Sequence, residues 1–226
     1  MTGTPWSAIA LSGDIEPGTA AGTRLSGREL VIWRDAAGEA HVFDDRCPHR
    51  GMKLSLGFVR GAEIACLYHG WRYDRAGLCR AIPAHPDLKV PATIRVARYP
   101  VSEQLGLIWV SLAEGDPLPP PTFVPDRPLT PLRSLHIEQS AETVRAALRA
   151  AGGHVADDGL WRLSAVGLPL LFALQAYGDE KTALHGLIDQ NPDKVALDAR
   201  HMATRWASRF RDTLEGVTDA AKGVGP

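Results

Sequence analysis

The sequence predicts an α+β fold, in which an antiparallel all-β domain is followed by a small α+β domain. Three observations predict it. Short segments rich in Val, Ile, Tyr and Trp, separated by turns, fill residues 6–115, as in a small antiparallel β domain. Residues 114–131 hold seven prolines, which exclude a regular helix or an inner strand. Patterns with helical periodicity follow at residues 140–153 and 194–217.

The predicted β domain consists of strand-like segments punctuated by turns. The hexapeptides DAAGEA at 35–40 and DRAGLC at 74–79 are typical of hairpin turns, and each supplies a glycine where a positive φ angle is expected. The expected strands are residues 29–35, 41–45, 63–69, 71–74, 93–104 and 106–112.

These patterns divide the chain into three parts. The β domain is expected over residues 1–115, and the small α+β domain over residues 132–226. The proline-rich segment between them, residues 116–131, is interpreted as an extended surface connection.

Helix and strand signals alternate in the second domain. Ser140 is the expected N-cap of the first helix, whose apolar stripe contains Val144 and Leu148 and which Gly152 ends. The expected strands are residues 132–140, 160–167, 168–178 and 181–189. One apolar side of the long C-terminal helix is formed by Met202, Trp206, Phe210 and Leu214.

Composition excludes several classes of function. The net charge is −1, the pI is about 6.7 and no polybasic run exists, so neither nucleic acid nor a membrane is an expected partner. The N-terminus does not resemble a signal peptide, and the apolar segment at 163–178 is too short to span a bilayer. Three cysteines without a secretion signal argue against a disulfide framework and predict a cytoplasmic protein with a metal-binding or catalytic use for them.

The residues that carry chemistry are two cysteine–histidine pairs. Cys47-x-His49 and Cys66-x-x-His69 are separated by sixteen residues. A zinc site also uses two cysteines and two histidines, but its ligands usually come as Cys–Cys and His–His pairs. Here each segment supplies one thiolate and one imidazole, which suits two metals bridged by sulfide. An iron–sulfur cluster is therefore favoured, with zinc as the alternative.

The segments RCPHRG (46–51) and CLYHGWRYD (66–74) resemble the two cluster-binding loops of the Rieske non-haem iron oxygenase family. The resemblance implies a Rieske [2Fe–2S] cluster, with two cysteines on one iron and two histidines on the other. The implied ligands are Cys47, His49, Cys66 and His69.

The loops are similar to those of the oxygenases rather than of the respiratory-chain Rieske proteins. The respiratory form adds a disulfide-forming cysteine to each loop, and the matching positions here hold Met52, or nearby residues, and Tyr68. The respiratory form also has a serine where Trp71 stands. Losing that hydroxyl destabilises the reduced cluster, so the resemblance implies a low potential, suited to electrons from NAD(P)H through a flavin.

Residues beside the ligands are expected to support the cluster. Gly51 and Gly70 let the backbone approach the sulfides without side-chain obstruction, and Trp71 and Tyr73 match the family's flanks. By formal charges, the oxidised cluster with its two thiolates is neutral, and the reduced cluster carries a charge of −1. The basic residues expected to favour that charge are Arg46, Arg50, Lys53 and Arg72. Cys79 is expected to be a small, half-buried apolar residue.

The family's second metal is not expected here. The resemblance covers about residues 6–125, and in the family a larger helix-grip domain follows, which binds a mononuclear non-haem iron through two histidines and a carboxylate. Only about 95 residues remain in this chain, so a shortened helix-grip domain is expected. The remaining candidates are the isolated histidines His136, His154, His185 and His201 and the pairs His154–Asp157 and Asp198–His201.

Three functions follow from these patterns. The absent iron motif favours an oxygenase-derived electron carrier, which accepts electrons from a flavin- or ferredoxin-type reductase and passes them to a separate oxygenase chain. Such a carrier could form homo- or hetero-oligomers, because electrons in the family pass between subunits. A complete small oxygenase for an aromatic or apolar substrate is the alternative, with strands in 160–188 lining its pocket. A redox-sensing or structural interaction protein is the third.

Overall fold

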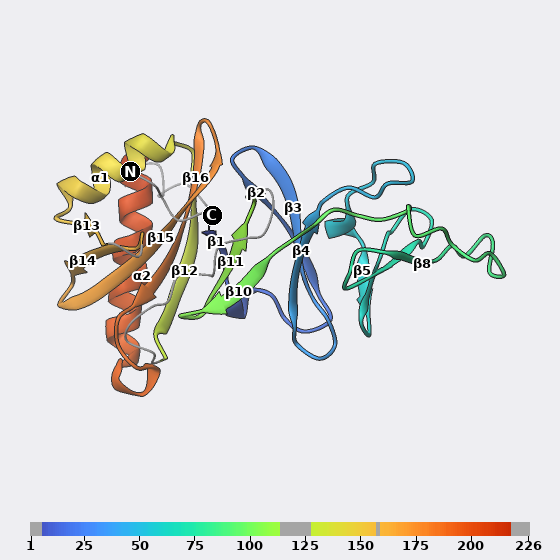
Figure 1. Cartoon of the computed structure of the whole chain (residues 1–226). Coiled ribbons are helices and arrows are strands. Elements are labelled where there is room, and N and C mark those ends of the chain that lie inside the picture. The colour runs from blue at the N-terminus through green and yellow to red at the C-terminus, as the bar shows by residue number, and fades with distance from the viewer. Residues whose placement is uncertain (1–5, 114–127, 157–158, 218–226) are drawn as a thin grey trace, which may run out of the picture.

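The computed structural model describes residues 6–113, 128–156 and 159–217. Within them, four antiparallel sheets and two α-helices form an elongated arrangement, with a small sheet at one end and the helices at the other (Figure 1). The α+β class expected from the sequence is confirmed. Neither helix in these residues is long and apolar enough to cross a membrane.

Three small sheets make up the N-terminal half of the chain. The first, in spatial order, contains β1 (Trp6–Leu11), β11 (Leu107–Ser111) and β10 (Val101–Gln104). The second contains β2 (Ala20–Leu25), β3 (Arg28–Arg34), β4 (Ala40–Asp44) and β9 (Arg98–Tyr99). The third contains β5 (Phe58–Arg60), β6 (Glu63–Ala65), β7 (Arg72–Asp74) and β8 (Cys79–Ala81).

A five-stranded sheet and two helices make up the C-terminal half. The sheet contains, in spatial order, β12 (Thr130–Ile137), β16 (Lys181–Ile188), β15 (Leu168–Gly178), β14 (Trp161–Ala165) and β13 (His154–Val155). The helices are α1 (Ala141–Ala150) and α2 (Leu197–Leu214). Most of the predicted proline-rich connection lies outside the described residues.

The two predicted hairpin turns are confirmed. Gly38 and Gly77 have φ angles of 89° and 76°, which only glycine adopts without strain. In each turn the leading aspartate, Asp35 or Asp74, accepts backbone N–H bonds from the residues two and four positions on, at 2.9 and 3.0 Å. A turn of this kind therefore closes β3 onto β4 and β7 onto β8.

Both faces of the five-stranded sheet are covered, as alternate residues of β15 illustrate. Leu170 and Phe172 pack in one hydrophobic cluster with the two helices. Leu171 and Ala173 point the other way and pack with β1 and β11. The central strands therefore contribute to the core on both faces of the sheet. A cavity of about 310 Å³ lies beside them and is lined in part by Leu163 of β14 and by Leu170 and Leu171 of β15.

The helices confirm one expected face and correct another. Ser140 caps α1 by accepting the Thr143 N–H at 3.2 Å, and its apolar stripe is buried. Three of the four residues on the expected apolar side of α2, Trp206, Phe210 and Leu214, pack against the core, whereas the Met202 side chain is 46% exposed. Ala203 and Ala207 are fully buried instead, since small side chains let the helix approach β12 closely.

Several element boundaries differ from those expected. The strand expected at 63–69 ends at Ala65, where a tight loop begins, and the segment 93–104 is broken at Pro100 into β9 and β10. The long helix starts at Leu197, after a 3₁₀ turn over Pro192–Lys194. Strands β1, β2, β5, β8 and β13 were not expected from the sequence.

The two halves of the chain are joined by hydrogen bonds at the tip of the β2–β3 hairpin. The Ser26 N–H donates to the Ala176 carbonyl at 2.7 Å, just beyond the centre of β15. Inside this joint, the Gln175 amide donates to the Thr23 hydroxyl at 2.9 Å and to the Arg24 carbonyl at 2.6 Å. The hairpin thus fastens the N-terminal sheets to the five-stranded sheet.

Candidate metal centre

Two loops with the same backbone hydrogen bonds present the predicted ligands. Loop one (Cys47–Met52) follows β4, and loop two (Cys66–Trp71) joins β6 to β7. In each loop the cysteine N–H donates to the carbonyl five residues on, and the glycine N–H four residues on donates back to the cysteine carbonyl, all at 2.8–3.0 Å. Gly51 and Gly70 take matching φ angles of 74° and 69°. The two loops are therefore near-copies in backbone structure.

The cysteines of the two loops lie side by side in the interior. Cys47 and Cys66 are each 2% exposed. Burial raises the pKa of the Cys66 thiol and the adjacent Cys47 raises it further, against the N–H groups of Tyr68 and His69, which lower it. Because metal binding needs the thiolate, a metal that enters here displaces protons. Cys79 is also buried, in agreement with its expected apolar role, and packs in the same cluster.

Tyr73 reaches the cysteine pair from β7. Its hydroxyl lies 3.1 Å from the Cys47 sulfur, and the side chain is fully buried. Burial raises the pKa of Tyr73, and the hydrogen bond to Cys47 raises it further, so the hydroxyl keeps its proton and can donate it to a thiolate. Of the predicted supporting residues, Tyr73 makes the most direct contact.

The histidines form a second pair nearer the surface. The His49 and His69 ring centroids are 4.7 Å apart. Each carries an aromatic neighbour from loop two: Trp71 stacks on His49 at 4.3 Å and 5°, and Tyr68 lies 3.8 Å from His69. Desolvation, His69 and Arg50 lower the pKa of His49, which favours the neutral imidazole that ligates metal.

The donor arrangement fits a two-metal cluster better than a single ion. Within the described part of the chain, no three of the four Cys and His donor atoms lie within 4.8 Å of one another. The donors of one tetrahedral zinc ion lie about 3.3–3.8 Å apart, given its bond lengths. Paired thiols in the interior and paired imidazoles nearer the surface suit two irons, each with its own pair of protein ligands.

Other predicted supporting residues lie close to the loops. Arg50 is exposed at the outer end of loop one. A side chain at Gly70 would place its Cβ 3.0 Å from the Pro83 side chain, so loop two fits closely against the segment that follows β8. Sequence reasoning missed Asp45, which is buried before loop one and accepts the Ser55 N–H and hydroxyl at 2.7 and 2.6 Å. Its position directly before the motif was the available signal.

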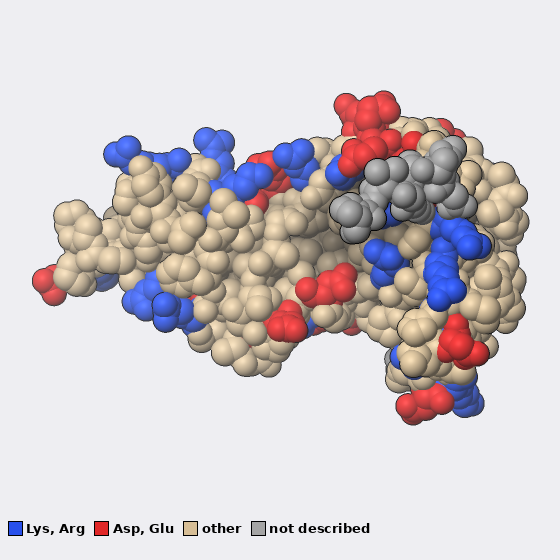
Figure 2. Space-filling model, turned by 180° about the vertical axis from the view of Figure 1, so that it is seen from behind, with Lys and Arg blue, Asp and Glu red and all other residues tan. Residues whose placement is uncertain are grey.

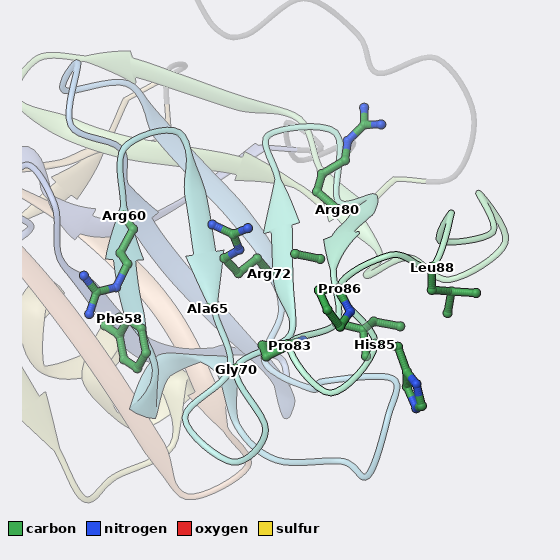
Figure 3. Close-up of a pocket in the computed structure, with 12 residues that line it drawn as sticks. Phe58, Arg60, Ala65, Gly70, Arg72, Arg80, Pro83, His85, Pro86 and Leu88 are labelled. Carbon is green, nitrogen blue, oxygen red and sulfur yellow. The ribbon is translucent and has the colours of Figure 1, made fainter.

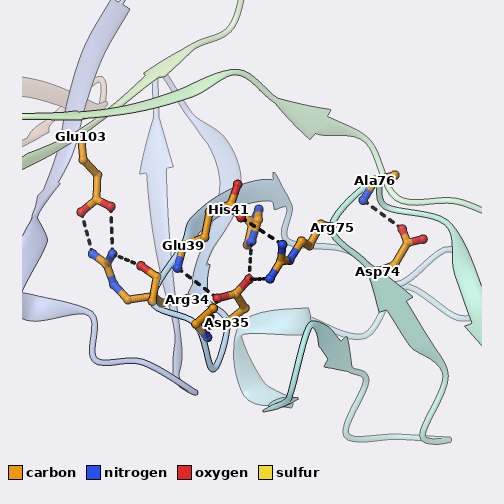
Figure 4. Close-up of polar contacts among 10 residues, drawn as sticks. Arg34, Asp35, Glu39, His41, Asp74, Arg75, Ala76 and Glu103 are labelled. Carbon is orange, nitrogen blue, oxygen red and sulfur yellow. Dashed lines mark hydrogen bonds and ion pairs between the residues drawn. The ribbon is translucent and has the colours of Figure 1, made fainter.

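Among the residues that the structure describes, one other group of donors lies close together, but an arginine already pairs with its carboxylates. The carboxylates of Asp35 and Glu39 and the imidazole of His41 lie within 4.8 Å of one another. The Arg75 guanidinium pairs with both carboxylates, at 2.6 and 3.2 Å (Figure 4). Burial opposes ionisation of Asp35, yet the Glu39 N–H, His41 and Arg75 together lower its pKa. The group fastens one hairpin turn to the other.

The candidates for a mononuclear iron do not converge where the structure describes them. Asp157 lies outside the described residues, so its pairing with His154 has no structural description. Asp198 and His201 are both exposed on α2. His185 is 2% exposed and lies 2.9 Å from the Ser134 hydroxyl and 2.8 Å from the Gln175 amide oxygen. His136 lies on the neighbouring strand β12 and packs edge-on against Tyr177.

Residues 5–100 match the family model of the Rieske [2Fe-2S] domain. The chain therefore contains a domain that binds a Rieske-type cluster. It is 42% identical over 128 residues to a 4beta-methylsterol monooxygenase of Methylococcus capsulatus, a stretch that covers 53% of this chain and 34% of that protein. It is 41% identical over 96 residues to a 3-chlorobenzoate-3,4-dioxygenase oxygenase subunit of Comamonas testosteroni, covering 42% of this chain and 22% of that protein.

Solved structures extend the likeness in fold to the whole chain. The apo structure of dicamba monooxygenase superposes with a TM-score of 0.74 at 18% identity and covers 100% of this chain and 92% of that one. The chain nevertheless spans about a third or less of the length of the curated relatives given above. The five-stranded sheet and its helices therefore share an oxygenase-like fold.

Proposed function

We propose that this chain, which belongs to the Rieske-type oxygenase family, carries single electrons from a reductase to an oxygenase active site on another chain. A [2Fe–2S] cluster, when bound, stores and releases one electron at a time. The observation that carries the proposal is the pair of matched loops, with buried thiols on one side and paired imidazoles on the other.

We assign each side chain of the centre a distinct part. Cys47 and Cys66 bind one iron and His49 and His69 the other. Burial of the two thiolates excludes water from them, and the Tyr73 hydroxyl donates a hydrogen bond to the Cys47 sulfur. The aromatic rings of Trp71 and Tyr68 hold the imidazoles in place. The exposed side chain of His69 offers the shorter route for electrons to and from solvent.

The C-terminal half supports electron supply rather than oxygenation by this chain. Its sheet is packed on both faces by apolar side chains. In the described residues, no two histidines and a carboxylate lie together as a facial triad requires. This half then serves as a rigid support and contact surface.

A complete small oxygenase remains the second candidate, because one specific observation favours it. The chain shares its fold, at 19% identity and with a TM-score of 0.70, with a structure of dicamba monooxygenase with non-heme iron and dicamba, of which it covers 90%. An iron in this chain would need ligands outside the histidine positions described above.

The expected partners are a flavin- or ferredoxin-type reductase and a separate oxygenase chain. The names of relatives as an oxygenase subunit or an oxygenase component support work in a multi-chain system. We place this work in the cytoplasm, because the three cysteines are free and buried and the site needs no disulfide.

Metal content and turnover test the proposal together. Purified protein should contain two irons and two sulfides per chain and show the electron paramagnetic resonance signal of a reduced Rieske cluster. Mixing with a reductase and an iron-containing oxygenase chain should make product formation depend on this protein. A third iron per chain, with O₂ uptake in the absence of any other oxygenase, would overturn electron supply in favour of the complete oxygenase.

A further inference from the structure

Positive charge is concentrated in the segment that carries the two loops. Residues 46–95 contain nine Lys and Arg against three Asp and Glu, a net charge of +6 in a chain whose net charge is −1. The rest of the chain therefore carries −7. Figure 2 shows several basic side chains over the narrow end of the molecule, with others on the bulky half.

A groove with basic walls runs along the outer face of the β5–β8 sheet. Phe58, Ala65, Arg72 and Ala81 are cross-strand neighbours, so their side chains lie on the same face, opposite the buried Tyr73. The small alanines form the floor of a cavity of about 530 Å³ that reaches Gly70 of loop two (Figure 3).

Three arginines surround this groove. Arg60 lies over the Phe58 ring at 4.9 Å. Arg72 is 3.5 Å from Glu63 and Arg80 is 2.5 Å from Asp74. Figure 3 shows the three arginine side chains on strands β5, β7 and β8 along the groove. The carboxylates of Glu63 and Asp74 partly neutralise Arg72 and Arg80, respectively. Both arginine side chains nevertheless remain exposed to solvent.

Exposed apolar side chains lie beside the same charges. Leu67 and Tyr68, directly before His69, are 56% and 55% exposed, and Leu88 at the other end of the groove is 50% exposed. Apolar contacts inside a basic rim are the composition of a protein-binding surface, because the apolar centre gives affinity and the charges guide encounter. His69 follows Tyr68 in loop two and is itself exposed, next to Gly70, which lines the groove.

Resting on the proposed function, we propose that the groove and loop two form the docking surface of an acidic one-electron donor protein. The charge of the surface selects an acidic partner, and contact over Leu67 and Tyr68 brings the donor close to His69. One electron leaves the donor and reduces the Rieske centre; no bond is made or broken. A small, weak interface suffices, as is typical of electron-transfer complexes.

The test uses the iron-loaded full chain and a plant-type [2Fe–2S] ferredoxin with an acidic surface. Stopped-flow mixing with reduced ferredoxin measures the second-order rate of electron transfer, which is downhill from about −400 mV. Fluorescence anisotropy of labelled, oxidised ferredoxin measures binding without any turnover. The variants are Arg60→Glu and the double variant Arg60→Glu/Arg80→Gln, and the matched control is Arg205→Glu, an exposed arginine on α2.

We expect the wild-type rate to fall as salt rises, and the double variant to lose about ten-fold in rate at low salt, at the lower end of electrostatic steering effects. Binding should weaken in parallel, and Arg205→Glu should match the wild type. Leu67→Ser should weaken binding at all salt concentrations, whereas Leu197→Ser, at an exposed position on α2, should not.

Photoreduced deazaflavin is a small electron donor that needs no docking surface. It therefore distinguishes a failure of the docking proposal from a failure of the proposed electron-transfer function. The arginine variants and Leu197→Ser should accept its electron at the wild-type rate. If ferredoxin reduces the wild type and the double variant equally fast, or without salt dependence, the docking surface is wrong and electron transfer stands. If deazaflavin reduces the wild type but no protein donor does, the proposed function itself fails.

Discussion

At the scale of single residues, two consecutive side chains of β7 point to opposite faces of the sheet and make different contacts. Arg72 points outward to the groove, while Tyr73 points inward and places its hydroxyl 3.1 Å from the Cys47 sulfur. The alternation of a strand is enough to separate them. The sequence motif identified Tyr73 as a supporting residue, but the atom that it contacts depends on the packing of β7 against loop one.

Tyr73→Phe should lower the reduction potential of the centre. A hydrogen bond to a cluster sulfur is stronger after reduction, so removing the hydroxyl destabilises the reduced state. A bond worth about 0.5–1.5 kcal/mol corresponds to a shift of about 20–65 mV for one electron. Redox titration followed by electron paramagnetic resonance measures it. Tyr99→Phe removes a hydroxyl bonded to Asp44 and should leave the potential unchanged; equal shifts in both variants would contradict the role of Tyr73.

His69→Cys tests the ligand assignment directly. A thiolate in place of a neutral imidazole adds negative charge to the centre, so a cluster should still form, at a lower potential and without proton-coupled reduction. The visible spectrum and the pH dependence of the potential are the measurements. The control is His201→Cys, an exposed histidine on α2. A visible spectrum identical to the wild type would show that His69 is not a ligand.

At the scale of elements, the two loops share a backbone although their ligand spacing differs by one residue. In both, glycine stands four residues after the cysteine and closes the same hydrogen-bonded turn. The histidine can move by one position because it lies inside this turn and takes no part in the closing bonds. The glycines were predictable as points of close approach; their shared positive φ angle required the structure.

Gly70→Ala and Gly61→Ala separate backbone strain from local fit. Both glycines have positive φ, 69° and 60°, so alanine should cost about 1–2 kcal/mol of unfolding free energy at either site. At Gly61 nothing lies within 4 Å of the added Cβ, whereas at Gly70 it would be 3.0 Å from Pro83. Iron content per chain should fall only in Gly70→Ala. Full iron content in that variant would mean that loop two tolerates a side chain there.

The helical half shows where sequence periodicity is insufficient. A four-residue repeat of large side chains predicted one apolar side of α2, and three of its members pack against the core, but Met202 is exposed and the alanines beside the repeat are the residues that become fully buried. Hydrophobicity favours the large residues, while close contact with β12 favours the small ones, and their balance depends on the distance between helix and sheet. Strands β1, β2, β5, β8 and β13 were missed for a related reason: they are short or mixed in pattern, and pairing with neighbours stabilises them.

At the scale of the whole molecule, a chain of polar contacts runs from the exposed Asp14 into the interior and joins distant parts of the sequence. The Ser134 hydroxyl bonds to Asp14 at 3.0 Å and to His185, which continues to Gln175 and from there to Thr23. Burial and the nearby His136 lower the pKa of His185 to about 3. No periodicity or motif indicated this network, because residues that bond directly within it lie up to 152 residues apart in the sequence.

His185 should make the protein less stable in mild acid. Its pKa is lower in the folded state than its ordinary value of 6.5, so its stabilising effect is complete above pH 6.5 and is lost as pH falls toward 3. Between pH 7.5 and 5.5 the expected loss is about 1.4 kcal/mol of unfolding free energy. Urea unfolding at both pH values measures it. His185→Gln should remove this part of the pH dependence, and an unchanged dependence in the variant would contradict it.

The joint between the β2–β3 hairpin and β15 decides how the molecule can deliver an electron. An electron carrier whose cluster-binding domain moves between donor and acceptor needs a flexible connection between that domain and the rest of the protein. Here Ser26 bonds to Ala176, and Gln175 reaches across to Thr23 and Arg24. These bonds hold the N-terminal sheets against the five-stranded sheet, so we expect the donor and the acceptor to bind in turn at one place, within tunnelling range of the cluster. The rate of electron delivery would then depend on how fast one partner protein dissociates and the next one binds.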